Sequence, residues 1–112
     1  MTTEEIIQGN KMIAEFDMLS MLKGGFYSIA GKLRTSEQLE YHSSWDWQIP
    51  SWSKIAHLTQ KLASEDMQFV PNHLSFADRY ESAIFTNDTQ KGFEVICDAI
   101  QCYNDNLKNQ QP

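Results

Sequence analysis

The residue types best suited to chemistry crowd into one short stretch, residues 41–52 of the 112-residue chain. Four neighbouring positions there carry the residue types of a hydrolytic triad: His42, Ser43, Ser44 and Asp46. A triad needs its base within hydrogen-bond reach of the nucleophile and an oxyanion hole, and adjacency in sequence supplies neither. Helix capping explains both serines and the aspartate without chemistry. We therefore expect no catalytic residues and no enzyme.

The same stretch is better suited to binding a partner. Trp45 and Trp52 lie on the apolar stripe of an expected helix, and Trp47 lies about 200° around the axis from Trp45. Trp47 is therefore expected to point outward, where an aromatic side chain can anchor a partner. With His42 and Asp46 it forms the candidate partner-binding site, the alternative being that Trp47 packs under a neighbouring loop.

No cofactor or metal site is expected. The chain has three histidines, His42, His57 and His73. No two of them share a ligand spacing such as i, i+4 on a helix. A phosphate-binding loop requires a lysine and a Ser/Thr at set positions beside its glycines. These are missing around Gly24, Gly25 and Gly31, so we interpret the three glycines as turn residues.

The two cysteines are expected to be free thiols. Cys97 and Cys102 lie five positions apart in a helical stretch, about 140° apart around the axis, too far apart to be bridged. Reduced cysteines are typical of a cytosolic protein, so the expected location is cytoplasmic.

The charge disfavours nucleic acid as a direct partner. Fifteen acidic residues against nine basic ones give a formal net charge of −6, and the basic residues are scattered. Nucleic-acid binding needs several cations on one face, whereas an acidic surface suits a basic protein partner. The apolar runs are far shorter than the roughly 20 residues that cross a bilayer, so no membrane association is expected either.

Three helices are predicted. Thr2 and Glu5 have capping-box spacing and open a helix over residues 3–17. Ser43 or Ser44 caps a second helix that reaches about residue 63, with Pro50 either near its start or at a kink. Apolar residues at steps of three and four predict a third helix over residues 89–106.

Strand-like composition separates these helices. Residues 26–30 and 38–42 are predicted to form a hairpin around a turn at 31–36, after a break at residues 23–25. Residues 67–70, 74–78 and 80–85 are expected to be further strand pieces. The predicted fold is therefore α+β, three helices packed on a small, mostly antiparallel sheet in the order α-β-β-α-β-β-α. It forms a single domain over residues 1–107 with a frayed polar tail at 108–112.

Three stretches carry a resemblance to a known group of proteins. They are the run Tyr41-His42-Ser43-Ser44-Trp45-Asp46-Trp47 with Pro50, Lys54 and Ile55, the opening at residues 3–16, and the close at residues 99–104, Ala-Ile-Gln-Cys-Tyr-Asn. This pattern resembles small uncharacterised proteins of Bacteroidetes and of their phages and prophages. The order of elements is also similar to the phage-associated α/β/α sandwich domain. The resemblance implies a phage or mobile-element context and carries no catalytic residues.

Charge, residue types and resemblance lead to one functional expectation. The chain is expected to be a non-enzymatic protein-binding module of phage or mobile-element origin that docks on a host protein and inhibits it. The alternative is a small accessory or structural domain that self-associates as a homodimer.

Overall fold

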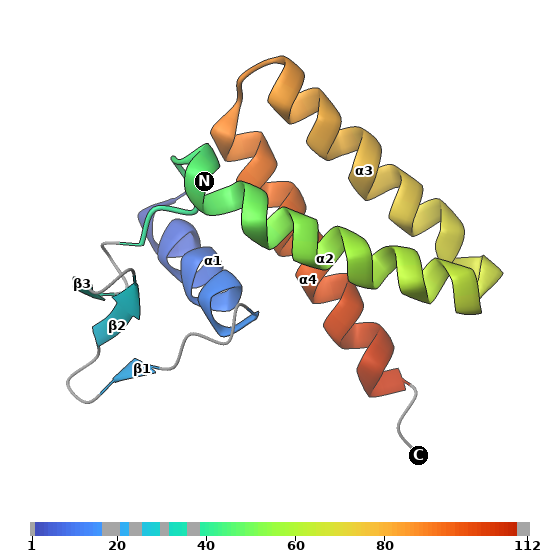
Figure 1. Ribbon diagram of the computed structural model, residues 1–112, viewed down its shortest axis with the longest axis horizontal. Coiled ribbons are helices and arrows are strands. Elements are labelled where there is room, and N and C mark those ends of the chain that lie inside the picture. The colour runs from blue at the N-terminus through green and yellow to red at the C-terminus, as the bar shows by residue number, and fades with distance from the viewer. Residues whose placement is uncertain (1, 17–20, 23–25, 30–31, 36–38, 110–112) are drawn as a thin grey trace.

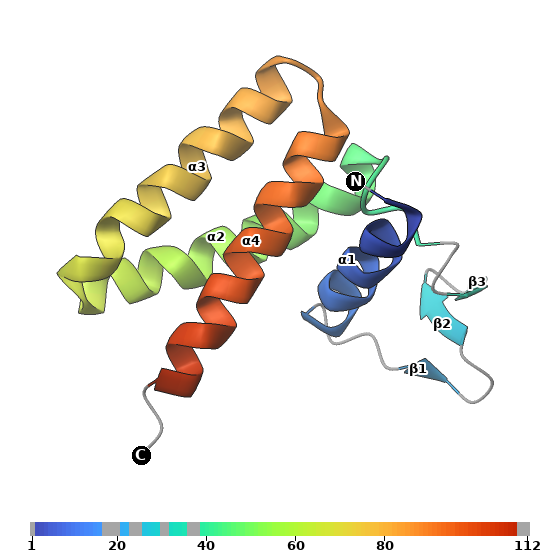
Figure 2. The same ribbon diagram turned by 180° about the vertical axis from the view of Figure 1, so that it is seen from behind.

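Four helices make up the body of the protein in the computed structural model, which describes residues 2–16, 21–22, 26–29, 32–35 and 39–109. They are α1 (Thr3–Phe16), α2 (Trp45–Glu65), α3 (Val70–Phe85) and α4 (Thr89–Asn109), with a short 3-10 turn, η2 (Met67–Phe69), before α3. Helix α4 contacts all three other helices. It crosses α2 and lies between α1 on one side and α3 on the other (Figures 1 and 2). Helix α4 is therefore the centre of the fold.

A small antiparallel sheet lies to one side. Its strands β1 (Met21–Leu22), β2 (Phe26–Ile29) and β3 (Lys32–Thr35) pair in the order β1-β2-β3. The sheet stands beside α1, away from α3 (Figures 1 and 2). Among the described residues, the main contacts between elements run within the sheet and among the helices, not from sheet to helix.

The predicted α+β fold class is therefore wrong, because the helices pack on one another and not on a sheet. The main error is at residues 67–85, read as strand pieces, which form η2 and α3. The buried residues of α3, Phe76, Tyr80 and Ala83, follow one another at steps of four and three, which is helical spacing. Pro71 lies in the first turn of α3, where its missing N–H removes no helical hydrogen bond.

The predicted hairpin is also displaced. Strand β2 coincides with the expected strand at residues 26–30, but β3 occupies Lys32–Thr35, where a turn was expected. The second expected strand is absent from described residues 39–42, where Leu39 and Tyr41 are buried core residues outside any strand. The expected break at residues 23–25 lies outside the described residues.

The three predicted helices are confirmed. The capping box opens α1, because Glu5 N donates to Thr2 Oγ1 at 3.1 Å and Thr2 N donates to Glu5 Oε1 at 3.4 Å. Ser44 occupies the predicted N-cap position of α2, but its side chain makes no capping hydrogen bond, and this helix runs through Pro50 without a break. Helix α4 begins at the predicted Thr89 and continues to Asn109, so residues 108–109 of the predicted tail are helical. Residues 110–112 lie outside the described residues.

Two glycines allow the helices to approach closely. A Cβ on Gly9 of α1 would lie 2.4 Å from Phe93 Cζ of α4. A Cβ on Gly92 of α4 would lie 2.5 Å from Gln48 Oε1 and 3.2 Å from Tyr80 Cε2. The distances of 2.4 and 2.5 Å are shorter than real Cβ contacts, so packing requires each glycine despite its poor helix propensity.

The core is contributed mainly by α4 and by the sides of the other helices that face it. Its apolar members with an exposed fraction of 0% are Ile13, Ala14, Leu39, Ile55, Ala83, Phe93, Val95, Ile96 and Ala99. None of the helices within the described residues is long and apolar enough to cross a bilayer.

Candidate functional site

His42 contacts two helices, α1 and α4. Its Nδ1 lies 3.0 Å from Asn10 Nδ2 of α1, and its ring lies edge-on to Phe93 of α4, with 6.0 Å between the ring centroids. Asn10 is fully buried, and its Oδ1 has no hydrogen-bond partner among the described residues. His42 is half-buried and satisfies the other end of this amide. It therefore holds the loop before α2 against α1.

Trp47 is not the freely exposed anchor that the helical spacing predicted. Its ring is half-buried, packs against the core and lies edge-on to Tyr41, with 5.1 Å between the centroids. The structure therefore follows the alternative in which Trp47 packs under a neighbouring segment. Asp46 in the first turn of α2 is exposed and remains available to a partner.

The other two tryptophans build the junction of α2, α3 and α4. Trp52 stacks on Tyr80 of α3, with 4.4 Å between the centroids and 20° between the planes. Trp45 Nε1 donates to Asn87 Oδ1 at 2.8 Å. Asn87 lies in the turn between α3 and α4 and has a left-handed φ of 54°, a conformation that asparagine tolerates well. The tryptophan-rich segment is thus chiefly structural.

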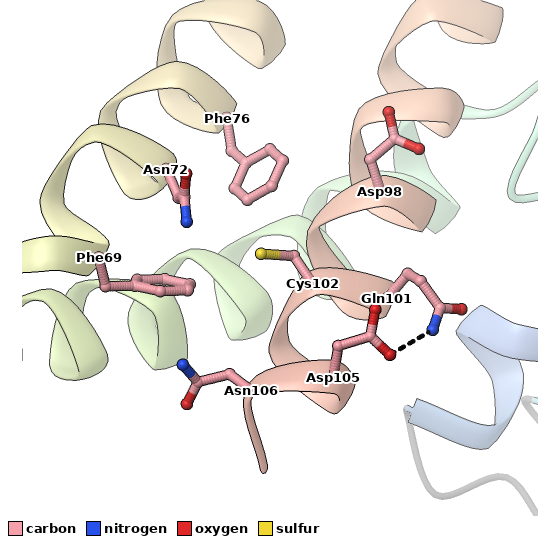
Figure 3. A pocket seen from close by; sticks show the side chains of 8 residues that line it. All are labelled: Phe69, Asn72, Phe76, Asp98, Gln101, Cys102, Asp105 and Asn106. Atoms are coloured by element: carbon pink, nitrogen blue, oxygen red, sulfur yellow. Dashed lines mark hydrogen bonds between the residues drawn. The ribbon is translucent and has the colours of Figure 1, made fainter. Parts of the chain in front are cut away.

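A cleft of about 460 Å³ lies between α3 and α4 (Figure 3). It is lined by Phe69, Asn72, Phe76, Asp98, Gln101, Cys102, Asp105 and Asn106. Figure 3 shows Phe69 and Phe76 on one side and Cys102 on the other, with polar side chains of α4 along the edge. The cleft therefore has an apolar floor and a polar, acidic rim.

The polar groups of the cleft are unsuited to catalysis. Burial, with Asp105 nearby, raises the pKa of the Cys102 thiol, and a thiol needs the opposite shift to act as a nucleophile. Asp98 Oδ2 accepts from Arg79 Nη2 at 2.7 Å, and Asp105 Oδ1 accepts from Gln101 Nε2 at 3.0 Å. Both acids thus bond neighbouring side chains, and burial shifts the pKa of the thiol away from that of an activated nucleophile.

The second cysteine points elsewhere. Cys97 is buried beside Gly9 of α1, and burial, with Asp98 and Glu94 nearby, raises its pKa to about 12. Both cysteines are free thiols. They contact different helices, as their angular separation predicted.

The solvent side of α3 carries an apolar and acidic stripe. It consists of Leu74, Asp78, Glu81 and Phe85, which we call the α3 outer face. All four side chains are exposed, Leu74 to 55% and Phe85 to 92%. Beside Phe85 the surface is hollowed by about 650 Å³, lined by Asp78, Glu81, Ser82, Ile84 and Phe85.

Within the part of the chain that the structure describes, no three His, Cys, Asp or Glu side chains gather as metal ligands would. His57 is exposed on α2. His73 Nδ1 lies 2.8 Å from Thr59 Oγ1, which joins α3 to α2. The histidines that the structure describes are thus spread over separate places.

The α3 outer face is the surface that sequence reasoning missed. Leu74 and Phe85 are eleven positions apart, which is three helical turns, so they share one side of a helix. This signal was present in the sequence, but it is readable only once residues 70–85 are recognised as a helix.

Comparison with known proteins gives no further guide: the chain matches no protein-family model, no curated protein and no solved structure.

Proposed function

We propose that this protein is a non-enzymatic binding module that docks on another protein through the α3 outer face. The single observation that supports this most is the exposure of Phe85, which is 92% accessible at the end of α3 beside a hollowed surface. Full burial of a phenylalanine side chain against a partner contributes about 1.5–3 kcal/mol to the free energy of binding. This burial is available to a partner, since the fold itself leaves Phe85 uncovered.

The surroundings of Phe85 also suit an interface. Leu74 and Ile84 on the same helix are 55% and 49% exposed, so apolar area extends along and around α3. Contiguous apolar surface rimmed by polar residues is typical of protein-binding sites. The Phe85 end of α3 meets this description, because Ile84 and Phe85 line the hollow there and Asp78 and Glu81 border it.

The proposed biological context rests on the resemblance to small phage and prophage proteins of Bacteroidetes. In that context the partner is a protein of the bacterial host, and binding inhibits it. The acidic charge of −6 adds a preference for a basic partner.

Affinity capture tests this proposal. Tagged protein is incubated with a Bacteroidetes lysate, and the bound proteins are identified by mass spectrometry for wild type, Phe85→Ser and Met67→Ser. Met67 is the matched control because it is an apolar side chain, 85% exposed, that lies in η2 and outside the α3 outer face.

The proposal expects one stoichiometric protein that is captured by wild type and Met67→Ser and is lost with Phe85→Ser. Recovery of the bait alone by all three proteins would contradict a host partner. A partner retained by Phe85→Ser would place the interface elsewhere, with Asp46 and the cleft between α3 and α4 as the next surfaces to change.

A further inference from the structure

The spacing and charge of the α3 outer face indicate what kind of partner it fits. We infer that it binds a basic amphipathic helix, with apolar side chains about three turns apart and lysine or arginine between them. This inference rests on the proposed function and specifies the partner's chemistry.

The geometry sets the spacing. Leu74 and Phe85 are eleven residues apart on α3, which at 1.5 Å per residue separates them by about 16 Å along the axis. Asp78 and Glu81 fall between them on the same side, and both are exposed. A facing helix with apolar residues at the two ends and cations in the middle matches this stripe along its whole length.

Two neighbouring basic side chains make their contacts away from Asp78 and Glu81. Arg79 of α3 is drawn away toward α4, where Nη2 bonds Asp98 Oδ2 at 2.7 Å. Lys91 reaches the edge of the hollow, where Nζ lies 3.0 Å from Ser82 Oγ. These contacts direct both cations to groups other than Asp78 and Glu81, so the stripe attracts a cationic partner.

Charge also selects against a second copy of this chain. A two-fold contact through α3 would place Asp78 and Glu81 opposite the same residues of the other copy. Carboxylates meeting in a partly dehydrated contact repel each other, and each copy carries a net charge of −6. A basic helix gains from the same groups.

The test uses the full chain and synthetic peptides of about four helical turns, long enough to cover the stripe. The basic peptide has leucines eleven positions apart and lysines at the two central positions. Matched peptides carry glutamine or glutamate in place of the lysines, or a central proline that breaks the helix. Affinity is measured by fluorescence anisotropy at low and high salt.

We expect the basic peptide to bind at least about tenfold more tightly than the glutamine peptide, with a difference that shrinks at high salt. The proline peptide should bind weakly. In the double variant D78K/E81K the preference should reverse, so that the glutamate peptide binds best. The double variant E15K/E65K changes two exposed acids, one on α1 and one on α2, by the same total charge and should keep the wild-type preference.

Each other outcome overturns the inference in a distinct way. Equal binding of basic and glutamine peptides, lost with Phe85→Ser, would leave a binding face without charge selection. Equal binding of the proline peptide would replace the helix by an extended segment. Binding of no peptide would reject the basic helix, while the lysate capture would still decide the proposed function. Wild-type dimers in light scattering that Phe85→Ser dissociates would make the occupant a second copy.

Discussion

The two faces of α3 use similar side chains in opposite ways. On the inner face Phe76, Tyr80 and Ala83 are buried against α2 and α4. On the outer face Leu74 and Phe85 are exposed to 55% and 92%. Both sets are apolar at helical spacing, so hydrophobicity alone does not distinguish them. What distinguishes them is whether another element of the chain covers that side of the helix.

The inner face is also the face where polar groups are satisfied. Gln48 of α2 is fully buried, and its Nε2 donates to Thr89 O at 2.8 Å while its Oε1 accepts from the Tyr80 hydroxyl at 3.3 Å. A buried amide without such partners would cost about 1–3 kcal/mol. The side chain of Gln48 thus ties α2 to both α3 and α4.

The largest expected effect comes from removing the central ring of the inner face. Tyr80→Ala should lower the free energy of unfolding by about 3–5 kcal/mol, because it leaves a cavity under Trp52 and removes the hydroxyl that bonds Gln48. Urea denaturation followed by tryptophan fluorescence measures this change. A loss below about 1 kcal/mol would contradict the packing described for this junction.

A smaller effect is expected from overfilling the same junction. In Gly92→Ala the new Cβ would meet Gln48 Oε1, Trp45 Cζ3 and Tyr80 Cε2. Overpacking costs about 1–3 kcal/mol and the gain in helix propensity offsets about 1 kcal/mol, so we expect a net destabilisation of about 1–2 kcal/mol. Ser75→Ala, at an exposed position of α3, is the control and should change the stability little. A Gly92→Ala protein as stable as this control would show that α4 has room to move.

Alkaline pH should lower the stability of the protein through the buried Cys97 thiol. The thiol pKa of Cys97 is about 12 in the folded protein and about 8.5 in an unfolded chain. Between these values the folded state holds the proton that the unfolded state has lost, so stability is constant below about pH 8.5 and falls above it. The expected slope from this group is up to about 1.4 kcal/mol per pH unit.

Denaturation of wild type and Cys97→Ala between about pH 8 and 10 isolates this contribution, which should disappear in the variant. Cys102→Ala is the matched control, because Cys102 is less buried and should leave most of the slope in place. Parallel slopes for wild type and Cys97→Ala would mean that the Cys97 thiol is accessible to water. Burial also raises the pKa of Tyr80, which adds to the loss of stability above about pH 10.

The smallest effect on stability is expected on the outer face. Phe85→Ser should leave the free energy of unfolding within about 0.5 kcal/mol of wild type, because the side chain is 92% exposed and gives up little packing. The same change should abolish partner capture. A destabilisation of 2 kcal/mol or more would show that Phe85 belongs to the fold, and the contrast between the two faces would be lost.

Part of this structure could be predicted because its signals are local. The capping box joins Thr2 to Glu5 across three positions by hydrogen bonds. Ser44 and Thr89 stand where α2 and α4 begin, although the Ser44 side chain makes no capping hydrogen bond. Hydrogen bonds between residues so close in the chain form without knowledge of the rest of the fold. The strand pieces predicted within residues 67–85 were wrong for a related reason. Short apolar runs around Pro71 are compatible with both strand and helix, and packing decides between them.

The features of the candidate site also fall into those that local sequence determines and those that tertiary packing determines. The sequence by itself determined the acidic charge, the starts of α1, α2 and α4, and the angular separation of Cys97 and Cys102, since each depends on composition or on local helix geometry alone. Only the tertiary structure decided that Trp47 is half-buried against Tyr41 and that His42 is bound to Asn10, 32 positions away. It also decided which side of α3 is covered, through contacts such as Trp52 of α2 with Tyr80 of α3. Whether a residue is buried depends on neighbours that are distant in the chain. The exposed face of α3 could therefore be identified only from the packing of the helices.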